Sequence, residues 1–282
     1  MQAMILGAGL GTRLRPLTLE LPKPAMPFGD TPLFALQAAQ LQSAGFSVVA
    51  MNASYLIEQL EPLANEQGIP LSRESEPLGT AGAIAHARLQ GLVRVEPLLV
   101  HNGDIYTQHS WQALATDLGD VYARLAVRER SLGEGSVGWN DAGHVVRLRK
   151  VSVAPESHSG DFLGVHCLGH SAIRMCKEGG CSVGDVYIPH LIAGGRPIEI
   201  ALVDAPVWDI GDPVNYHAAC LAWGSGHWVS ERALVQAQVR TSVVGAGARI
   251  LADISGVVVW PGASVNEPLQ NAIVTPTCIV HL

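Results

Sequence analysis

Charged and aromatic residues are scarce in this 282-residue sequence: Asp, Glu, Lys and Arg make up 15% of it, and Phe, Trp and Tyr 5%. The basic residues form no cluster and the net charge is −7, which argues against a nucleic-acid partner. No apolar run reaches the roughly 18 residues that a membrane span requires. Hydrophobic residues nevertheless make up 48%. We therefore expect one large folded domain, or one domain with an appendage.

Cysteine is also sparse, and its pattern excludes two common kinds of site. The five cysteines contain no C-x-x-C pair, so a disulfide framework and a structural metal cluster are both poorly supported. The first residues lack the basic segment and cleavage site of a secretion signal. These absences predict reduced thiols in a cytoplasmic protein without a membrane partner.

Common catalytic patterns are few as well. Among the eleven histidines, only His166 and His170 have the H-x-x-x-H spacing, and we expect His101, His166 and His190 to be packing or polar-edge residues. No G-x-x-x-x-G-K-[ST] string is present, which excludes a Walker A loop.

A glycine loop near the N-terminus is the most informative feature that is present. Gly7, Gly9 and Gly11 follow the apolar run at residues 3–6, as in a strand that ends in a turn. Glycines let backbone N–H groups converge on an anion without obstruction by Cβ atoms. The loop is therefore a candidate phosphate-binding loop.

Three cations accompany these glycines: Arg13, Arg15 and Lys23, the last between Pro22 and Pro24. Glycines and cations in one loop suit a polyphosphate. A dinucleotide-binding G-x-G-x-x-G loop fits poorly, because the third glycine comes one position early and the Pro-Lys-Pro unit has no role there. A glycine turn that only shapes the backbone leaves the three cations unexplained.

The pattern G-x-G-x-G-T-R-L-x-P-L-T over residues 7–18, followed by P-K-P and Pro27, resembles the signature of the sugar-1-phosphate nucleotidyltransferases, also called nucleotide-sugar pyrophosphorylases. The resemblance covers most of residues 1–220. Family members use the motif to hold a nucleoside triphosphate. The resemblance implies that Arg13 contacts the phosphates that leave as pyrophosphate. It implies that Lys23 binds phosphate near the reacting centre, and both would be catalytic residues.

A second glycine segment, L-G-T-A-G at residues 78–82, opens a predicted helix. Its glycines could let a flat base approach closely, or Thr80 could simply cap the helix. This form resembles family members that use GTP, and also some that use UTP or CTP. Together with the first loop, the resemblance implies a set of nucleotide-binding residues: Leu6, Gly7, Ala8, Gly9, Gly11, Thr12, Arg13, Pro77, Gly79, Thr80, Asn102 and Gly103.

Two aspartates are the predicted metal ligands. Asp104 ends an apolar run in an N-G-D turn, and Asp209 lies in W-D-I-G. Carboxylate oxygens suit Mg²⁺ that is held together with phosphate oxygens. In the family, the aspartates of an N-G-D turn and a W-x-x-G turn share one Mg²⁺, so the resemblance implies Mg²⁺ on Asp104 and Asp209. A lone N-G-D is otherwise a common turn, and Asp212 is a nearby competitor.

The sugar-phosphate side is implied by the same resemblance at Lys150, Gly164 and Asp185. Lys150 takes the place of the lysine in the family's E-K-P motif, although Arg149 and Val151 replace its glutamate and proline. Gly164 lies in a predicted strand over residues 161–168. Asp185 lies in a segment that often contacts sugar hydroxyls. A solvated surface position is the alternative for Lys150.

Apolar strand-like runs alternate with helical stretches in the first two-thirds of the chain. We predict helices over residues 32–44, 56–64 and 81–89, with strands over 46–51, 69–73 and 97–100. Continuous apolar strands between helices favour a parallel sheet that is covered on both faces, with ligands beyond the carboxyl ends of its strands. We expect an α/β fold, a Rossmann-like mostly parallel sheet with flanking helices, as a catalytic domain over residues 1–227.

After residue 228 the sequence changes to a repeat of about 15 to 17 residues, in which apolar β-branched residues precede small ones. Short fixed periods of this kind are typical of solenoids. The repeat resembles the hexapeptide-repeat left-handed β-helix that follows the catalytic domain in many family members. We expect a short C-terminal stub of this kind over residues 228–282, with a β-meander as the alternative. It would cap the core or mediate a homo-oligomer such as a dimer.

The predicted reaction needs no general base, because a sugar-1-phosphate oxygen is already anionic. The resemblance implies transfer of a nucleotidyl group from an NTP to a sugar-1-phosphate, with GTP and mannose-1-phosphate as the first expectation. Two alternatives stay open. One is UMP or CMP transfer to an amino-sugar phosphate, such as N-acetylmuramate-1-phosphate, or to a phospho-alcohol. The other is a catalytically inactive regulatory relative.

Overall fold

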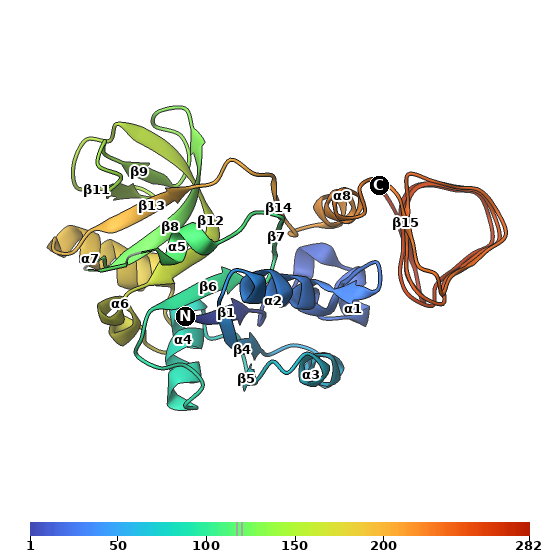
Figure 1. Cartoon of the computed structure of the whole chain (residues 1–282), viewed down its shortest axis with the longest axis horizontal. Helices are drawn as coiled ribbons and strands as arrows, with labels where there is room; N and C mark the ends of the chain where they lie inside the picture. Colours follow the sequence, from blue (N-terminus) through green and yellow to red (C-terminus); the bar gives the residue numbers. More distant parts are fainter. Residues whose placement is uncertain (117, 120) are drawn as a thin grey trace.

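The computed structural model describes residues 1–116, 118–119 and 121–282. A ten-stranded mixed sheet forms the centre of the N-terminal part (Figure 1). Its first half is parallel, in the order β5 (Leu71–Arg73), β4 (Ser47–Ala53), β1 (Gln2–Leu6) and β6 (Leu98–Asn102). The connecting helices are α2 (Leu33–Ser43), α3 (Ile57–Glu66) and α4 (Thr80–Leu89).

Alternate residues of β1 belong to two different cores. Met4 packs in the cluster that contains α4, whereas Ala3 and Ile5 pack in the cluster that contains α2 and α3. All three side chains are fully buried. A strand that is buried on both faces has no polar side, which is why this region reads as continuous apolar runs in the sequence. The predicted α/β class and its parallel strands are confirmed here.

Beyond β6 the sheet is mainly antiparallel. The long strand β12 (His158–Leu168) pairs antiparallel with β6, β8 (Ala123–Arg130) and β9 (Val137–Trp139). Hairpins then add β10 (Val145–Leu148) and β11 (Val151–Ser152), while β13 (Ile198–Leu202) pairs parallel with β8. The parallel arrangement thus holds for the strands before residue 103, where helices make the connections. Later strands joined by short turns run antiparallel.

Short elements complete the N-terminal part. They are η1 (Thr12–Leu14), α1 (Leu17–Glu20), η2 (Lys23–Ala25), β2 (Pro27–Phe28), β3 (Thr31–Pro32), β7 (Ile105–Thr107), α5 (Gln112–Ala115), α6 (His170–Met175), η3 (Ser182–Tyr187), α7 (Ile188–Ala193), β14 (Val207–Asp209) and α8 (Pro213–Trp223). Among the described residues, none of the helices combines the length and apolarity needed to cross a bilayer.

The C-terminal segment winds into superposed coils at one end of the molecule (Figure 1). Trp228 pairs in parallel with Val243, and Val243 pairs with Val258, so that each step is 15 residues. One sheet contains β15 (Trp228–Val229), β18 (Val243–Val244), β20 (Ile254–Val259), β22 (Leu269–Val274), β17 (Val239–Arg240) and the antiparallel β23 (Ile279–His281). Another contains β16 (Leu234–Val235), β19 (Arg249–Ile250) and β21 (Ser264–Val265).

A shared hydrophobic cluster joins the coils to the glycine-loop region. Leu14 and Leu17 belong to the same cluster as Tyr216 of α8. The coils contribute four buried side chains to it: Val243, Val258, Trp260 and Ile273. The Tyr216 hydroxyl also donates a hydrogen bond to the Pro27 carbonyl. The two parts of the chain therefore share one core.

Because the core is shared, a cavity made in the coils should destabilise the whole chain. Ile273→Ala removes a fully buried side chain and should lower the free energy of unfolding by about 2–5 kcal/mol. The matched change at Ile279, which is 48% exposed on the neighbouring strand β23, should cost less than about 0.5 kcal/mol. Calorimetry should show one transition that moves as a unit. A separate low-temperature transition of the coils would contradict this.

Candidate functional site

The glycine loop leaves β1 at the edge where three parallel strands end. The Gly7 N–H donates to the Asn52 Oδ1 atom at 2.8 Å, and the Gly103 N–H donates to the Leu6 carbonyl at 2.8 Å. A Cβ atom at Gly7 would lie 2.9 Å from the Asn52 carbonyl oxygen, and one at Gly103 would lie 2.5 Å from that of Leu6. These two glycines allow the ends of β1, β4 and β6 to pack tightly.

Gly9 and Gly11 have different roles in the loop. Gly11 has a left-handed backbone (φ 60°), and its carbonyl accepts a hydrogen bond from the Thr18 hydroxyl at 2.8 Å. A Cβ atom at Gly9 would meet no described atom within 4 Å. Packing within the protein therefore does not require a glycine at position 9. The missing side chain leaves the backbone open to the space in front of the loop.

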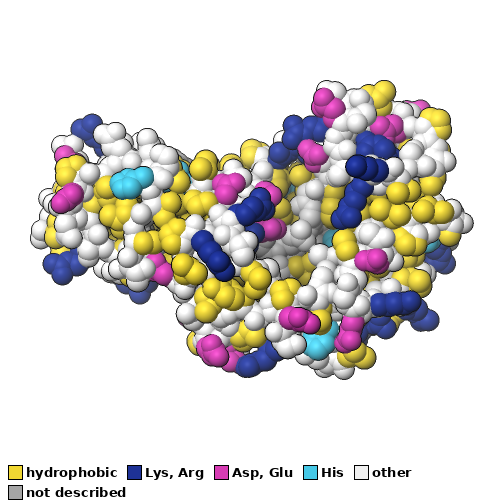
Figure 2. All heavy atoms as spheres, turned by 180° about the vertical axis from the view of Figure 1, so that it is seen from behind, with side chains coloured by type: hydrophobic (Ala, Val, Ile, Leu, Met, Phe, Trp, Pro, Cys, Tyr) yellow, Lys and Arg dark blue, Asp and Glu magenta, His cyan; other side chains and the backbone are white. Residues whose placement is uncertain are grey.

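That space is a cavity of about 230 Å³. Its lining residues are Leu6, Ala8, Gly9, Asn52, Glu74, Pro77, Gly79, Thr80, Asn102 and Asp104. Most of the predicted nucleotide-binding residues thus face one space. The others, Gly7, Gly11, Thr12, Arg13 and Gly103, adjoin it in the sequence. Figure 2 shows basic and acidic side chains bordering a hollow in the middle of one face of the molecule.

Two lining residues, Asn52 and Glu74, were not predicted. They are 4% and 3% exposed. The Asn52 amide donates to Glu74 Oε1 at 2.8 Å, and Glu74 Oε2 accepts the Leu78 N–H at 3.0 Å. Both lie at the carboxyl ends of parallel strands, like Asn102 on β6. Applying the strand-end rule to every parallel strand would have found them.

The predicted catalytic and metal residues meet beside this cavity. The Lys23 ammonium donates to Asp104 Oδ2 at 3.0 Å. Pairing of β14 with β7 places Asp209 opposite Ile105, and the Ile210 N–H donates to the Asp104 carbonyl at 2.7 Å. Burial, and then the charge of Asp104, raise the pKa of Asp209, while Lys23 and Arg13 act in the opposite direction.

Arg13 reaches the same edge from η1. A Cβ atom at Gly211 would lie 2.9 Å from Arg13 Nη2, so the guanidinium lies over the backbone that follows Asp209. Glycine at this position is what admits it. The edge of the sheet therefore carries two cations and two carboxylates that come from four separate segments.

The two carboxylates fit a divalent cation that prefers oxygen ligands. The hydrogen bond from the Ile210 N–H to the Asp104 carbonyl holds the two segments together, and burial and then the charge of Asp104 raise the pKa of Asp209. Among the described residues, no set of three or more His, Cys, Asp or Glu side chains could hold a metal ion. An ion at Asp104 and Asp209 would therefore need further oxygen atoms from substrate phosphates and water, as Mg²⁺ commonly does.

The second glycine segment, part of which lines the cavity, also makes contacts within the protein. A Cβ atom at Gly79 would lie 2.6 Å from the Gly180 carbonyl oxygen, and one at Gly82 would lie 2.8 Å from the Gly179 nitrogen. The glycines thus make room for backbone 179–180 and not only for a base. Gly79 is the N-cap of α4, whereas Thr80 accepts the Ser182 N–H at 2.7 Å.

Of the predicted sugar-side residues, Asp185 lies beside this junction and Gly164 lies beside Asn102. Asp185 in η3 accepts the Cys181 N–H at 2.6 Å. Gly164 has φ 75°, and a Cβ atom there would lie 2.5 Å from the Asn102 amide nitrogen. Lys150 is exposed on the turn after β10, without a hydrogen bond or ion pair in the described part of the chain. Its neighbour Arg149 instead reaches Cys181 Sγ at 3.6 Å. Sugar contacts stay a prediction.

The buried histidines have packing environments. Burial lowers the pKa of His101 to about 4 and that of His166 to about 3, so both are neutral near pH 7. His190 stacks on Tyr122 with ring centroids 3.4 Å apart. These environments agree with the predicted packing roles.

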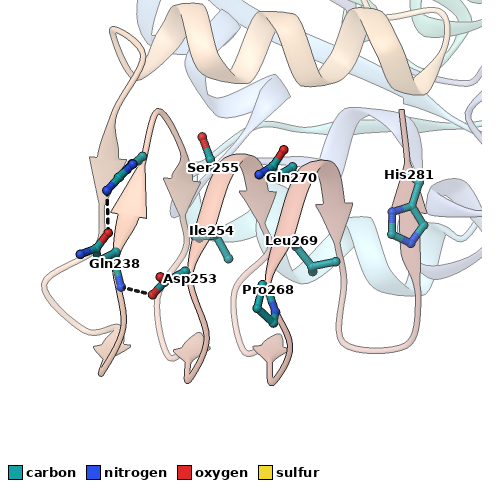
Figure 3. A pocket seen from close by; sticks show the side chains of 9 residues that line it. Gln238, Asp253, Ile254, Ser255, Pro268, Leu269, Gln270 and His281 are labelled. Carbon is teal, nitrogen blue, oxygen red and sulfur yellow. Dashed lines mark hydrogen bonds between the residues drawn. The ribbon is translucent and has the colours of Figure 1, made fainter.

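A larger groove of about 600 Å³ lies on the coils (Figure 3). Gln238, Asp253, Ser255 and Gln270 line it, together with His281. It shares no lining residue with the glycine-loop cavity. Its size alone does not make it the functional site, because the cations and carboxylates described above lie elsewhere.

Comparison with known proteins agrees with this geometry. Residues 2–127 match the sequence profile of the family described as Nucleotidyl transferase. Mannose-1-phosphate guanyltransferase beta-B of Xenopus laevis is 43% identical over 111 residues, which are 37% of this chain and 31% of that protein. Mannose-1-phosphate guanyltransferase of Emericella nidulans is 27% identical over 228 residues, 77% of this chain and 62% of that protein. The chain is thus similar in sequence to nucleotidyltransferases, and the match to the family profile lies in residues 2–127.

The matches leave much of these nucleotidyltransferases uncovered, since the chain spans about a third of the Xenopus relative (31%) and 62% of the Emericella relative. The crystal structure of HddC from Yersinia pseudotuberculosis complexed with GMP-PN is similar with a TM-score of 0.64. It is 22% identical, and the similarity covers 79% of this chain and 99% of that chain. This likeness establishes the shared fold.

Asp209 should carry a stability cost that its charge creates. Because its pKa is raised in the folded state, the ionised form is disfavoured there at neutral pH. Asp209→Asn should therefore raise the melting temperature slightly at pH 7. The gain should vanish below about pH 4, where the carboxyl is protonated in both states. Thermal melts across pH would measure this, with exposed Asp141→Asn as the control. A lower melting temperature at pH 7 would contradict it.

Proposed function

We propose that this protein transfers a nucleotidyl group from an NTP to a sugar-1-phosphate and releases pyrophosphate. The observation that carries the proposal is the convergence of Lys23, Asp104 and Asp209 beside the cavity of the glycine loop. Cations and paired carboxylates suit phosphate chemistry. No general base is needed, because the attacking phosphate oxygen is already anionic. GTP and mannose-1-phosphate are the first substrates to test, because the relatives are named mannose-1-phosphate guanyltransferases.

In this proposal a phosphate oxygen of the sugar-1-phosphate attacks the α-phosphorus of the NTP. A new P–O bond forms, the bond from the α-phosphorus to the bridging oxygen breaks, and that oxygen leaves with pyrophosphate. The open backbone at Gly9 faces the triphosphate. Lys23 and Arg13 offset the charge that develops on the phosphates. Catalysis then consists of positioning and charge stabilisation.

Asp104 and Asp209 would hold Mg²⁺ in the loaded enzyme. The ion would neutralise charge on the phosphate oxygens. Lys23 already contacts Asp104 at 3.0 Å, so it keeps a positive charge beside the carboxylate pair. Because Lys23 has no other anionic partner among the described residues, its ammonium can contact a phosphate oxygen without breaking a further ion pair.

We further propose that the C-terminal coils form a short left-handed β-helix, with a coil of 15 residues in place of the 18 that three hexapeptides would occupy. The support is the 15-residue offset between parallel strands of successive coils. Its outer faces are the natural place for contacts between copies in a homo-oligomer, and the enzyme would act in the cytoplasm. Sedimentation of the full chain tests the oligomeric state.

Pyrophosphate release tests the reaction directly. Five NTPs would be combined with the 1-phosphates of mannose, glucose, heptose, N-acetylglucosamine and N-acetylmuramate, with and without Mg²⁺. We expect release only with one matched pair and only with Mg²⁺. Release with UTP or CTP and an amino-sugar phosphate would reassign the substrates. A folded protein that binds an NTP but releases no pyrophosphate with any acceptor would contradict the proposal.

Asp104→Asn should separate catalysis from folding. Loss of the carboxylate should reduce turnover by at least about 10²-fold, the loss typical of a removed charge-stabilising group. The melting temperature should change little, because the Lys23–Asp104 pair is partly exposed and such pairs contribute up to about 1 kcal/mol. Exposed Asp141→Asn is the control. Full turnover in Asp104→Asn would remove this residue from the site.

A further inference from the structure

Glu20 is tied to the coils by three donors. It is the last residue of α1, three positions before Lys23. Its Oε1 atom accepts hydrogen bonds from the hydroxyls of Thr275 and Thr277 and from Cys278 Sγ at 3.6 Å. All three donors come from the turn between β22 and β23. Hydrogen bonds to an ionised acceptor are stronger than neutral ones, so this oxygen is a firm attachment point.

Asp30 provides a second attachment on the other side of Lys23. It lies in the turn between β2 and β3. Its Oδ2 atom accepts the Ser230 hydroxyl at 2.7 Å, and its Oδ1 atom accepts the Ala246 N–H at 2.5 Å. Arg232 also approaches it at 3.6 Å. The segment 20–30 is thus held by carboxylates at both of its ends.

Between these attachments a cavity of about 360 Å³ lies between the segment and the coils, beside the shared cluster that contains Met26 and Phe28. Leu21, Ala25 and Pro27 line it from the N-terminal part, and Trp260, Pro261 and Pro276 line it from the coils. The carboxylate contacts at Glu20 and Asp30 therefore add polar attachments to the apolar contact that Met26 and Phe28 make in the shared cluster.

The short link from Glu20 to Lys23 is stiff. Pro22 and Pro24 flank Lys23, and proline fixes its own φ angle. The Ala25 N–H donates to the Pro22 carbonyl at 2.8 Å, and the Met26 N–H donates to the Lys23 carbonyl at 3.2 Å. Few free torsions remain in this stretch. A displacement of Glu20 is therefore transmitted to the Lys23 backbone.

We propose that Glu20 is a positioning residue for Lys23, and that the coils act as part of the catalytic unit by holding Glu20. This inference rests on the proposed function. The coil turn fixes Glu20, the proline-flanked segment fixes Lys23, and the Lys23 ammonium stays beside Asp104 at 3.0 Å. Removal of the Thr277 hydroxyl would then lower the reaction rate, because this hydroxyl holds Glu20 from a position 257 residues away in the sequence.

The first test compares Glu20→Ala with Glu20→Gln in the full chain, using the NTP and acceptor pair found active with the wild type. Glu20→Ala should lower kcat about 10- to 100-fold, as expected when a charged group is misplaced by about 1 Å. KM for the NTP should change little, because the lost interaction is made mainly in the transition state. Glu20→Gln should recover part of kcat, since its amide oxygen still accepts hydrogen bonds.

The second test makes the change on the coils. Thr277→Val removes an exposed hydroxyl that donates to Glu20 and should also lower kcat, by less than Glu20→Ala. The double variant should be no worse than Glu20→Ala alone, because both changes break one connection. The control is Asp253→Asn, which weakens a contact inside the coils, the Gln238 N–H to Asp253 Oδ1 bond at 2.9 Å (Figure 3). It should leave kcat unchanged.

Melting temperatures of all variants separate positioning from loss of fold. A kcat loss in Glu20→Ala that persists at a temperature where the variant is fully folded supports the proposal. Unchanged kcat in Glu20→Ala, or an equal loss in Asp253→Asn, would overturn it while leaving the wild-type reaction intact. A wild type that is inactive with every substrate pair would instead overturn the proposed function.

Discussion

The contact between the Lys23 ammonium and the Asp104 carboxylate, at 3.0 Å, is the constraint on which the site depends. It joins the N-terminal signature segment to the end of the central parallel strand β6. The sheet delivers Asp104, and pairing of β14 with β7 brings Asp209 to the same edge. The proline-flanked turn delivers Lys23. Each of these elements would be an ordinary loop or strand end without the others. Together they place charges of both signs beside one cavity.

Such a concentration of charge opposes folding locally. Burial and the neighbouring Asp104 raise the pKa of Asp209, so the folded state holds this carboxylate at a cost. Arg13 and Lys23 offset part of that cost. The rest is offset by apolar burial elsewhere, in cores on both faces of the sheet and in the cluster shared with the coils. Sites built for chemistry commonly lose stability in this way.

Local patterns in the sequence predicted much of the site. The glycine spacing, the flanking cations and the N-G-D turn are short-range signals, and the structure brings their residues together. These short-range signals do not reveal where a glycine also makes room for a distant part of the chain. Gly79 and Gly82 make room for residues 179–180, and Gly164 makes room for Asn102. Asn52 and Glu74 carry no motif at all, and only the strand order reveals that they face the cavity. Arg149, which has a left-handed backbone (φ 55°), contacts Cys181 at the start of η3, and no pattern in the sequence predicts this contact.

In the C-terminal segment, too, the sequence repeat predicts some features of the structure and not others. A repeat of apolar and small residues predicts stacked strands, since each coil buries its face only against its neighbours. It says nothing about which outer residues meet the rest of the chain. Thr277 and Glu20 are 257 positions apart, and neither belongs to a recognisable motif. The boundary predicted after residue 227 follows a change in period, but the hydrophobic cluster crosses it. A change of repeat therefore marks a change of local geometry, whereas the core decides which segments act as one body.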